Sequence, residues 1–400
     1  MKKVKKLNKL KELINELCPN GVKYKNIQEL CKISRGKVMS KDFIKANAGE
    51  YPVYSSQTEN NGELGKISTY DFDGEYLTWT TDGANAGSVF YRKGKFSVTN
   101  VCGLLEIKSK VMIPKFLYYV LSIEAPKYVN AGMGNPKLMS NVMAKIRVAV
   151  PPLEVQCEIV HILDDFTLLS AELSAELEAR KRQYCYYREK LFEFNNDGEL
   201  KTMGELFPFI RNGFVGTIRP FFTDEKNGIR YLEGTNIHNG IISDNEMIYV
   251  TKEFHQRHKK NELKEDDILM VQSGHIGECA VVGKKYKGAN CHALIIMSNG
   301  GKCLSKYIVH YFHTLKGFKA LNPAITGGTI KHVLAGKIGK IKVPCPPIEE
   351  QTKIVNILDK LEKLCNDISE GLPAEIEARQ KQYEYYRAKL LTFKELKVNE

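Results

Sequence analysis

The sequence predicts an α+β protein with two globular α/β domains separated by two long antiparallel coiled-coil helices, in a pseudo-two-fold circular arrangement. The first observation is a repeat. PPLEVQCEIVHILDDF at 151–166 and EARKRQYCYYREKLF at 178–192 correspond to PPIEEQTKIVNILDKL at 346–361 and EARQKQYEYYRAKLL at 377–391. The second is that each repeated stretch follows a longer region rich in Gly, Tyr, Thr and β-branched residues, which is typical of a β-containing domain. Repetition in the same order indicates duplicated structural units.

The first expected element is an N-terminal helix over residues 1–18 that packs with the repeated helices. Its sequence KLKELINELCPNGV resembles YYREKLFEFNNDGEL, which ends the first repeated stretch. The lysine-rich start leads into alternating Leu, Lys and Glu rather than an apolar signal stretch, and the longest apolar runs have the length of strands. We therefore expect an unanchored, cytoplasmic protein.

The next elements are a domain over residues 19–150 and a second one over residues 196–345. Their sequences correspond in four places, in the same order. The matching pairs are YKNIQELCKISRG with LKTMGELFPFIRNG, YSSQTENNG with YLEGTNIHNG, YLTWTTDGANAGSVFY with ILMVQSGHIGECAVV, and GMGNPKLMSNVMAKIRVAVPP with GGTIKHVLAGKIGKIKVPCPP. This order predicts that the two domains share one fold.

The long helices are expected over residues 151–195 and 346–400, because apolar residues recur there at steps of three and four. A single apolar stripe usually marks only the core-facing side of a helix. Two matching stripes favour packing of the two helices against each other as a coiled coil. The second copy is four residues longer than the first, and Gly371 with Pro373 is expected to break or bend it.

Charge and cysteine content narrow the class of protein. The net charge of +12 and the pI near 9.0 predict an acidic partner, most commonly nucleic acid, although charge alone also fits a membrane surface. The ten cysteines are scattered without a Cys-x-x-Cys pair. This pattern disfavours zinc and suits reduced thiols in the core.

The repeated elements, together with ELCPNGVKYKNIQEL near the start, give the chain a resemblance to the specificity subunits of type I restriction-modification systems over nearly its whole length. Pro-Pro-x-Glu-x-Gln and Gln-Tyr-x-Tyr-Tyr-Arg, each present twice, carry this resemblance. It implies that each domain is a target recognition domain that reads one half of a bipartite target in double-stranded DNA. It also implies that the helices set the spacing between the halves.

The same resemblance implies the partners. These are two modification (methyltransferase) subunits that use S-adenosylmethionine, and restriction (motor-nuclease) subunits that use ATP and Mg²⁺. The helices are expected to dock the modification subunits, and internal packing of the coil is an equal alternative for the positions concerned. The candidate docking residues are Tyr184, Tyr187, Arg188, Tyr383, Tyr386 and Arg387.

Catalysis within this chain is not expected. A DNA methyltransferase needs an Asn/Asp-Pro-Pro-aromatic loop beside a flipped base, and only Asn-Pro-Lys at 135–137 and Asn-Pro-Ala at 322–324 come near it. The phosphate-binding pattern G-x-x-x-x-G-K-[ST] is missing from the sequence. The pairs His255 with His258 and His310 with His313 lack further ligands at suitable spacing, so ordinary histidines and no metal or cofactor are expected. A coiled-coil scaffold would explain the helices and the charge but not the paired domains.

Base readout needs side chains with hydrogen-bonding groups that reach base edges, while Lys and Arg contact phosphates. For each residue singly, a turn or capping role is as good an explanation as base contact. In the first domain the candidates for base contact are Ser55, Ser56, Gln57, Asn61, Thr80, Thr81, Asp82, Asn85, Asn135 and Lys137. In the second they are Glu233, Thr235, Asn236, His238, Gln272, Ser273, His275, Thr329, Lys331 and His332. Candidate phosphate contacts are Arg35, Lys37, Arg92, Lys93, Lys95, Arg211 and Arg219.

The two sets of candidates differ in side-chain chemistry at matching places. Ser-Ser-Gln at 55–57 of the first domain corresponds to Leu-Glu-Gly at 232–234 of the second. Different side chains recognise different base edges. The sequence therefore predicts a split target whose two halves are not identical.

Overall fold

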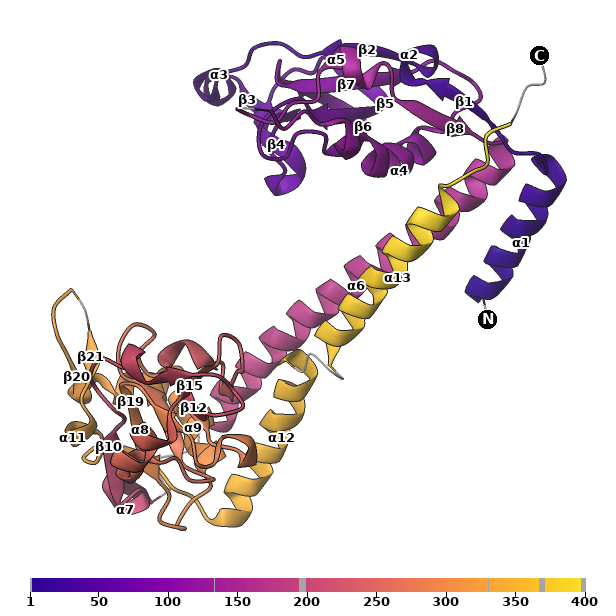
Figure 1. Cartoon of the computed structure of the whole chain (residues 1–400). Helices are drawn as coiled ribbons and strands as arrows, with labels where there is room; N and C mark the ends of the chain where they lie inside the picture. The colour runs from indigo at the N-terminus through magenta and orange to yellow at the C-terminus, as the bar shows by residue number, and fades with distance from the viewer. Residues whose placement is uncertain (1, 133, 194–198, 330, 367–370, 397–400) are drawn as a thin grey trace. The chain divides into compact units, whose positions relative to one another are not determined.

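The computed structural model describes residues 2–132, 134–193, 199–329, 331–366 and 371–396 of the chain (Figure 1). The backbone divides into two compact units, one of Met1–Ser174 with Glu375–Glu400 and the other of Ala175–Ala374. Each unit combines sheets with helices, and the predicted α+β class is confirmed. Within the described ranges no helix is both long and apolar enough to cross a membrane.

The domain of the first unit is built on a six-stranded sheet, ordered β2-β7-β5-β6-β3-β4. All its strand pairs are antiparallel except β3 with β6. The core under the sheet holds Trp79, Phe116 and Leu117, which are fully buried. The strands are β2 (Cys31–Arg35), β3 (Ala48–Tyr54), β4 (Glu63–Ile67), β5 (Phe72–Thr80), β6 (Val89–Val98) and β7 (Cys102–Ile107), with β1 (Lys23–Asn26) pairing β8 (Arg147–Val150). The helices are α2 (Ile27–Leu30), α3 (Lys41–Ala46), α4 (Pro114–Glu124) and α5 (Ser140–Met143), with the 3-10 turns η1 (Glu59–Gly62) and η2 (Ala125–Tyr128).

The domain of the second unit has two four-stranded sheets in place of the six-stranded one, ordered β10-β19-β16-β17 and β11-β15-β12-β18. The strands of these sheets are β10 (Phe209–Asn212), β11 (Phe222–Thr223), β12 (Ile229–Leu232), β15 (Ile248–Val250), β16 (Ile268–Val271), β17 (Cys279–Val281), β18 (Asn290–Cys291) and β19 (Leu294–Ser298). Three two-stranded pairs are β9 (Leu200–Thr202) with β22 (Lys342–Pro344), β13 (Ile237–His238) with β14 (Ile241–Ile242), and β20 (Ile325–Thr326) with β21 (His332–Val333). The helices are α7 (Met203–Leu206), α8 (Lys252–Arg257), α9 (Ser305–Phe312), α10 (Leu315–Ala320) and α11 (Ala335–Ile338). Five 3-10 turns complete the domain: η3 (Arg219–Phe221), η4 (Gly234–Asn236), η5 (Lys259–Asn261), η6 (Lys284–Tyr286) and η7 (Asn322–Ala324).

The start of each domain shows how closely the duplication is kept in local structure. Asn26 and Thr202 directly precede the short helices α2 and α7. The backbone N–H of each donates a hydrogen bond to the carboxylate of the glutamate three positions later. Asn26 N donates to Glu29 Oε2 at 2.7 Å, and Thr202 N donates to Glu205 Oε2 at 2.6 Å. This reciprocal arrangement satisfies donors that would otherwise be orphaned at a helix start. The same signal, Asn or Thr followed by Glu, thus builds the same turn in both domains.

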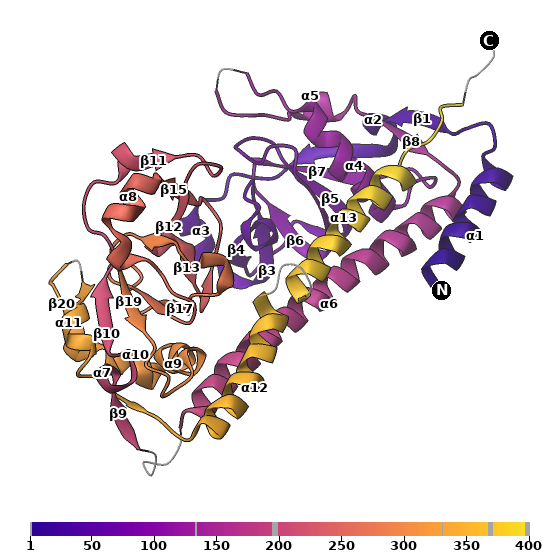
Figure 2. The same cartoon turned by 60° about the horizontal axis from the view of Figure 1, so that its bottom comes forward.

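In the first unit, α6 (Leu153–Leu191) packs with two other helices, as Figure 2 shows, and Phe166 of α6 lies in the core between them. The Phe166 ring stacks on Tyr386 of α13 (Leu372–Leu390) with 5.5 Å between ring centroids. On another side, α1 (Lys2–Leu17) forms ion pairs from Lys6 to Asp165 at 2.6 Å and from Lys9 to Glu158 at 2.7 Å. In these contacts, later residues of α6 meet earlier residues of α1 and of α13. Both helices therefore pack antiparallel to α6.

In the second unit, the later part of α6 packs antiparallel to α12 (Ile348–Asn366). Tyr184 is buried in the same core as Leu358 and Cys365 of α12. The second copy of the long helix consists of two described helices, α12 and α13, on either side of residues 367–370, which lie outside the described ranges. The first copy, α6, is continuous over 39 residues. These bounds agree with the predicted break at Gly371 and Pro373.

Eight of the ten cysteines are buried free thiols, as expected for core positions. Burial raises the pKa of Cys31 and of Cys102 to about 12, so these thiols stay protonated near neutral pH. The prediction is wrong for Cys157 and Cys185, which are exposed on α6. Both lie on the side of the helix away from the apolar stripe.

Close packing of Gly103 against Trp79 gives a test of the first domain. A Cβ atom on Gly103 would lie 2.3 Å from the ring of Trp79, which is fully buried. We expect Gly103→Ala to lower the free energy of unfolding by about 1–3 kcal/mol through overpacking. Denaturant titrations followed by circular dichroism and by fluorescence of Trp79, the one tryptophan of the sequence, measure the loss.

Gly336→Ala is the matched control, because a Cβ atom at Gly336 meets no heavy atom within 4 Å. It should leave the unfolding midpoint close to that of the unaltered protein. An unchanged midpoint for Gly103→Ala would contradict the packing described here.

Candidate nucleic-acid interface

Three loops of the first domain lie side by side. The loop at 55–62 follows β3, the loop at 81–88 connects β5 to β6, and the loop at 129–139 follows η2. Asn85 Nδ2 donates to Thr58 Oγ1 at 3.0 Å and joins the first two loops. Leu138 N donates to the Thr81 carbonyl at 2.9 Å and joins the second loop to the third. The candidate residues of this domain, dispersed over more than 80 positions, are thereby gathered in one region.

The side chains of this region differ in their exposure to solvent and in their hydrogen bonds. Those that are exposed are Asn61, Asn85, Asn135 and Lys137. Those that are half-buried are Ser55, Ser56, Gln57 and Asp82. Ser55 Oγ accepts a hydrogen bond from the Thr99 hydroxyl at 3.1 Å, and the Gln57 amide donates to the Glu63 carbonyl. The exposed amides and Lys137 are therefore the groups most available to a ligand.

The second domain gathers three corresponding loops, at 233–239, 272–278 and 325–333. Asn239 N donates to Glu278 Oε2 at 2.9 Å, and Val333 N donates to the Gln272 carbonyl at 2.9 Å. The rings of His238 and His275 lie 6.3 Å apart. The exposed candidates are Thr235, His238, Ser273, His275, Thr329, Lys331 and His332, whereas Glu233 and Gln272 are half-buried.

Two backbone contacts between loops have counterparts in both clusters. The bond from Leu138 N to Thr81 in the first domain matches the bond from Val333 N to Gln272 in the second, and both are 2.9 Å long. An isolated β-bridge joins Asp82 to Lys137, and its counterpart joins Ser273 to His332. Lys137 and His332 thus occupy equivalent places, as the sequence comparison predicted.

One part of the sequence comparison is out by one residue. Thr99 N donates to the Tyr54 carbonyl at 2.9 Å, and His292 N donates to the Leu232 carbonyl at 2.8 Å. These bonds align Tyr54 with Leu232, whereas matching the first tyrosines of YSSQTENNG and YLEGTNIHNG aligned Tyr54 with Tyr231. A one-residue shift turns a strand side chain to the opposite face. In the corrected alignment Tyr231 corresponds to Val53, and both are fully buried.

Three candidates for base contact are buried and serve the domain itself. Thr80 and Thr81 donate their hydroxyls to the carbonyls of Asn85 and Val101. The side-chain amide of Asn236 holds the turn after it, with Nδ2 donating to the carbonyls of Ser243 and Asn245. Side chains buried to this extent do not reach a base edge, so we correct these three predictions to structural roles.

Arg92 is also corrected, because its side chain is only 2% exposed. The guanidinium stacks on the rings of Tyr54, at 3.5 Å from the centroid, and Phe90, at 4.6 Å. Its Nε donates to Thr78 Oγ1 at 3.1 Å. Burial lowers the pKa of Arg92 from its usual value. A contact with the phosphate backbone does not fit this position.

The remaining candidates for phosphate contact are five exposed side chains and one that is held inside its domain. Those exposed are Arg35, Lys37, Lys93, Lys95 and Arg219. Lys37 pairs with Asp71 at 2.6 Å, but an exposed ion pair is weak enough to exchange for a phosphate. Arg211 donates to Ser298 Oγ at 2.8 Å and faces the buried Asp267 at 3.7 Å. Because these partners hold Arg211 inside the domain, its prediction is corrected as well.

A basic hollow on the second domain was missed in the sequence. It has a volume of about 390 Å³ and is lined by Arg230, Lys285 and Lys287, together with Tyr249 and Glu262. The run Lys-Lys-Tyr-Lys at 284–287 was the signal that could have found it. Its side chains add candidate phosphate contacts to those predicted.

The candidate docking residues of the helices are mostly occupied by internal packing. Tyr184 is buried, and the guanidinium of Arg188 lies 5.1 Å from its ring. In the matching copy, Arg387 lies 5.2 Å from the ring of Tyr383. Tyr386 stacks on Phe166. Of the six predicted residues, only Tyr187 is exposed.

The most exposed aromatic side chains of the two copies are Tyr186 and Tyr385, at 58% and 60% exposure, and Tyr187 is exposed at 40%. These two tyrosines occupy the same place in the two Gln-Tyr-x-Tyr-Tyr-Arg elements. The spacing of the apolar stripe could have found them, because each lies two positions after a stripe residue and so faces away from the partner helix.

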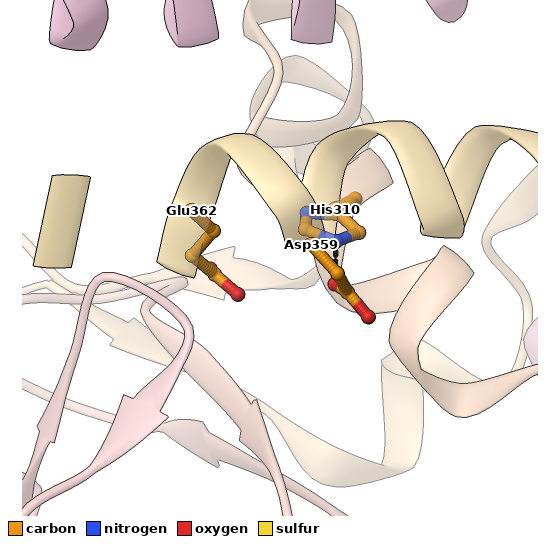
Figure 3. A group of neighbouring side chains, drawn as sticks. All are labelled: His310, Asp359 and Glu362. Carbon is orange, nitrogen blue, oxygen red and sulfur yellow. Dashed lines mark hydrogen bonds and ion pairs between the residues drawn. The ribbon is translucent and has the colours of Figure 1, made fainter. Parts of the chain in front are cut away.

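His310, Asp359 and Glu362 approach one another within 4.8 Å where α9 meets α12 (Figure 3). The donor types would suit a metal ion, but a cation from the protein already lies among them. Lys306 Nζ is 2.6 Å from Glu362 Oε2 and 3.9 Å from Asp359 Oδ1. His310 Nε2 lies 2.9 Å from Asp359 Oδ1. This network joins the domain to its helix.

The other histidines of the predicted pairs have ordinary structural partners. His255 Nδ1 lies 2.7 Å from Asn290 Oδ1, and the His258 ring stacks on Phe254. Burial, with Arg188 and His310 nearby, lowers the pKa of His313 to about 3, so its ring is neutral at neutral pH. These positions agree with the interpretation of the histidines as structural residues.

Comparisons with known proteins give the family. A sequence model of the type I restriction modification DNA specificity domain matches the chain twice, at residues 19–179 and 195–378. A putative type I specificity subunit of Mycoplasma pneumoniae is 35% identical over 91% of this chain and 96% of its own length. A second one from the same organism is 35% identical over 81% of this chain and 95% of its own.

Solved structures support the fold. The crystal structure of a type I restriction-modification S subunit from M. genitalium matches with a TM-score of 0.57 at 15% identity, over 93% of this chain and 96% of that one. A chain from a study of complex assembly and conformational transition of the type I system matches with a TM-score of 0.60 at 14% identity, over 93% and 98%. With two specificity domains in one chain and close relatives over nearly its full length, this protein belongs to the specificity subunits of type I restriction-modification systems, which are not catalytic by themselves.

Proposed function

We propose that each domain reads one half of a bipartite, non-palindromic DNA target through its cluster of three loops. The observation that carries this proposal is that the two clusters share a backbone framework and differ in side chains. Equivalent hydrogen bonds hold the loops in both domains, yet Lys137 of one cluster is replaced by His332 in the other. The same geometry with different hydrogen-bonding groups suits two readers of different sequences.

Readout of the first half-site rests on the exposed amides of Asn61, Asn85 and Asn135 and on the Lys137 ammonium. An amide can pair with the donor and acceptor of adenine in the major groove, and an ammonium favours the two acceptors of guanine. In the second domain, the imidazoles of His238, His275 and His332 take this place beside Lys331. Exposed Arg and Lys side chains around each cluster hold the protein on the phosphates and fix its register.

We assign the remaining chemistry of the system to partner subunits. Two modification subunits would bring S-adenosylmethionine, and restriction subunits would bring ATP and Mg²⁺. This chain has no sequence pattern for these cofactors, and its described His-Asp-Glu group is filled by Lys306. Such an assembly acts on cellular DNA, which places this protein in the cytoplasm.

Docking of the modification subunits is assigned to the exposed side of the helices. Tyr186 and Tyr385 each present a large ring to solvent, in the same place of the two copies. Arg182 and Lys381 are exposed and each precedes its tyrosine by four residues, so each lies on the same helical face as that tyrosine. Two equivalent surfaces suit two copies of one partner.

The first test is the pattern of methylated bases in genomic DNA of cells with an active system. We expect a target of two different half-sites with a gap between them, because the two loop clusters carry different side chains. Sequencing that detects methylated adenine or cytosine gives the consensus. A palindromic consensus would contradict the proposal that the two domains recognise different half-sites.

A second test addresses docking. We expect Arg182→Glu with Lys381→Glu to weaken binding of the modification subunits about tenfold or more, since charge reversal at two equivalent surfaces opposes a complementary partner. Co-purification and titration of the partner measure the effect. DNA binding by the isolated subunit is the control and should not change, and loss of both activities together would argue for misfolding instead.

A third test addresses the spacing. Four residues inserted after Ser174 lengthen α6 by roughly 6 Å and nearly preserve its packing face, since four residues are close to one turn. We expect the variant to keep both half-sites and to prefer a gap longer by about one or two base pairs of 3.4 Å. A library of half-sites at different gaps, read by methylation with the partners present, gives the preference.

A two-residue insertion at the same position is the matched control. It rotates the packing face by about 200° and should abolish the complex. If the four-residue variant kept the original gap, the helices would be a docking platform only and the spacing would be set elsewhere.

A further inference from the structure

The buried glutamine of the Pro-Pro-x-Glu-x-Gln element is not explained by the packing of the long helices. Gln156 and Gln351 occur at the same place in the two copies and are 0% and 1% exposed. A buried amide is costly unless its hydrogen bonds are satisfied. The partners of these two amides therefore show what the element does.

Gln156 joins α6 to the first domain through two hydrogen bonds and makes a third to the residues that lead into its own helix. Its Oε1 accepts from the backbone N–H of Ile113 at 2.8 Å. Ile113 is the residue that precedes α4 and has no side-chain oxygen to cap it. Gln156 Nε2 donates to the carbonyl of Val111 at 2.8 Å and to that of Pro151 at 2.7 Å. One side chain thus holds the start of α4 against the start of α6.

Gln351 repeats this arrangement in the second unit. Its Oε1 accepts from the backbone N–H of Leu304 at 2.9 Å, and Leu304 precedes α9 as Ile113 precedes α4. Its Nε2 donates to the carbonyl of Pro346 at 2.7 Å and lies 3.7 Å from Cys345 Sγ. The start of α9 is thereby fixed to the start of α12.

A second attachment lies two helical turns further along each long helix. In the first unit, Asp164 accepts from Lys115 Nζ at 2.8 Å and from the Tyr119 hydroxyl at 2.5 Å. Lys115 and Tyr119 are four residues apart on α4 and so lie on one face. Burial and, to a lesser extent, the hydrogen bond to the Asp164 carboxylate raise the pKa of Tyr119. Its hydroxyl therefore stays protonated and donates the hydrogen bond.

The second unit has the corresponding attachment at Asp359. It lies 2.9 Å from His310 Nε2 and 3.9 Å from Lys306 Nζ, and these two residues have the same four-residue spacing on α9. In both units the aspartate follows the glutamine by eight residues. The same two-point joint is therefore present twice.

We propose that Gln156 and Gln351 are positioning residues, each of which fixes the angle of its recognition domain on the long helix and thereby the gap between the half-sites. The two attachments of each joint lie about 12 Å apart along the helix. Apolar packing holds each domain on its helix, and two directional polar contacts at this separation define the angle between them more sharply than one contact would. The glutamine is the buried and therefore the stiffer of the two, because Asp164 and Asp359 remain partly exposed.

A small change at this joint is large at the DNA. A compact domain of about 130 residues is roughly 35 Å across. A tilt of about 6° at its base moves its far end by about 3.4 Å, which is the rise of one base pair. Loosening the joint should therefore blur the preferred gap without altering the bases that the loops read.

The experiment uses the full-length chain with its modification subunits, on a DNA library that carries both half-sites at gaps of different length. Gln156→Met and Gln351→Met keep the size of the side chain and remove its hydrogen bonds. We expect selectivity for the preferred gap over its neighbours to fall about tenfold in each variant, equivalent to about 1.4 kcal/mol, and further in the double variant. Base preferences within each half-site should stay as in the unaltered protein.

Gln380→Met is the matched control, because Gln380 is an exposed glutamine that, within the described residues, donates to Glu384 of its own helix, α13. It should leave the gap distribution unchanged. If a methionine variant does not fold, Asp164→Asn and Asp359→Asn test the same joints at their partly exposed ends, where a loss of charge is better tolerated.

The inference rests on the proposed function, and the outcomes separate the two. A split target with a defined gap in the unaltered protein, and the same narrow gap in folded variants of both joints, would overturn the role of the glutamines and leave the proposed function standing. A loss of methylation at all gaps with no broadening would likewise overturn it, because that is the result of a merely structural defect. If the unaltered protein recognised no split target, the proposed function would fail and this inference with it.

Discussion

The structure depends on the burial of one apolar stripe along α6 against different partners in its two parts. Near its start the stripe is covered by α1 and α13, with Phe166 stacked on Tyr386. Further along it is covered by α12, with Tyr184 in the core. A helix of 39 residues is roughly 58 Å long and gains most of its stability from such packing. Gln156 of α6 bonds to the first domain, and Gln351 of α12, which packs on α6, bonds to the second. If the stripe were not covered, neither domain would be held at a fixed position on the helices.

The two copies share backbone interactions but differ in the side chains of their loops. The bonds that hold the loops together, and the capped turn at the start of each domain, have counterparts in both units. At the equivalent positions Lys137 and His332 the side chains differ in size and charge. A framework built from backbone hydrogen bonds tolerates such replacements because it does not use the side chains that face outward. This division allows one fold to carry two different readers.

The fold could be predicted from the sequence because repeated motifs mark equivalent elements, and the helical bounds follow from the apolar period. The individual contacts could be predicted less well. Arg92 resembles a surface cation in sequence, yet Tyr54 and Phe90 cover it; Tyr54 lies far away along the chain. Tyr184 and Tyr186 are nearly adjacent, but helical geometry buries the first and exposes the second. Burial of a polar side chain depends on tertiary partners that local patterns do not name, whereas the loops that hold the exposed candidates were recognisable by their Gly, Asn and Ser content.

The first unit combines an early and a late segment of the chain, and this affects the order in which the two units can fold during synthesis. Residues 375–390, near the end of the chain, cover α6 at Phe166, and the Val22 N–H donates to the Lys394 carbonyl at 2.9 Å. The second unit, by contrast, is a continuous stretch of chain from Ala175 to Ala374. It has all its residues while the first unit still presents an uncovered apolar helix to the cell. The first unit therefore folds fully only after residues 375–396 have been synthesised, and a chain that stops before them leaves it as the aggregation-prone half.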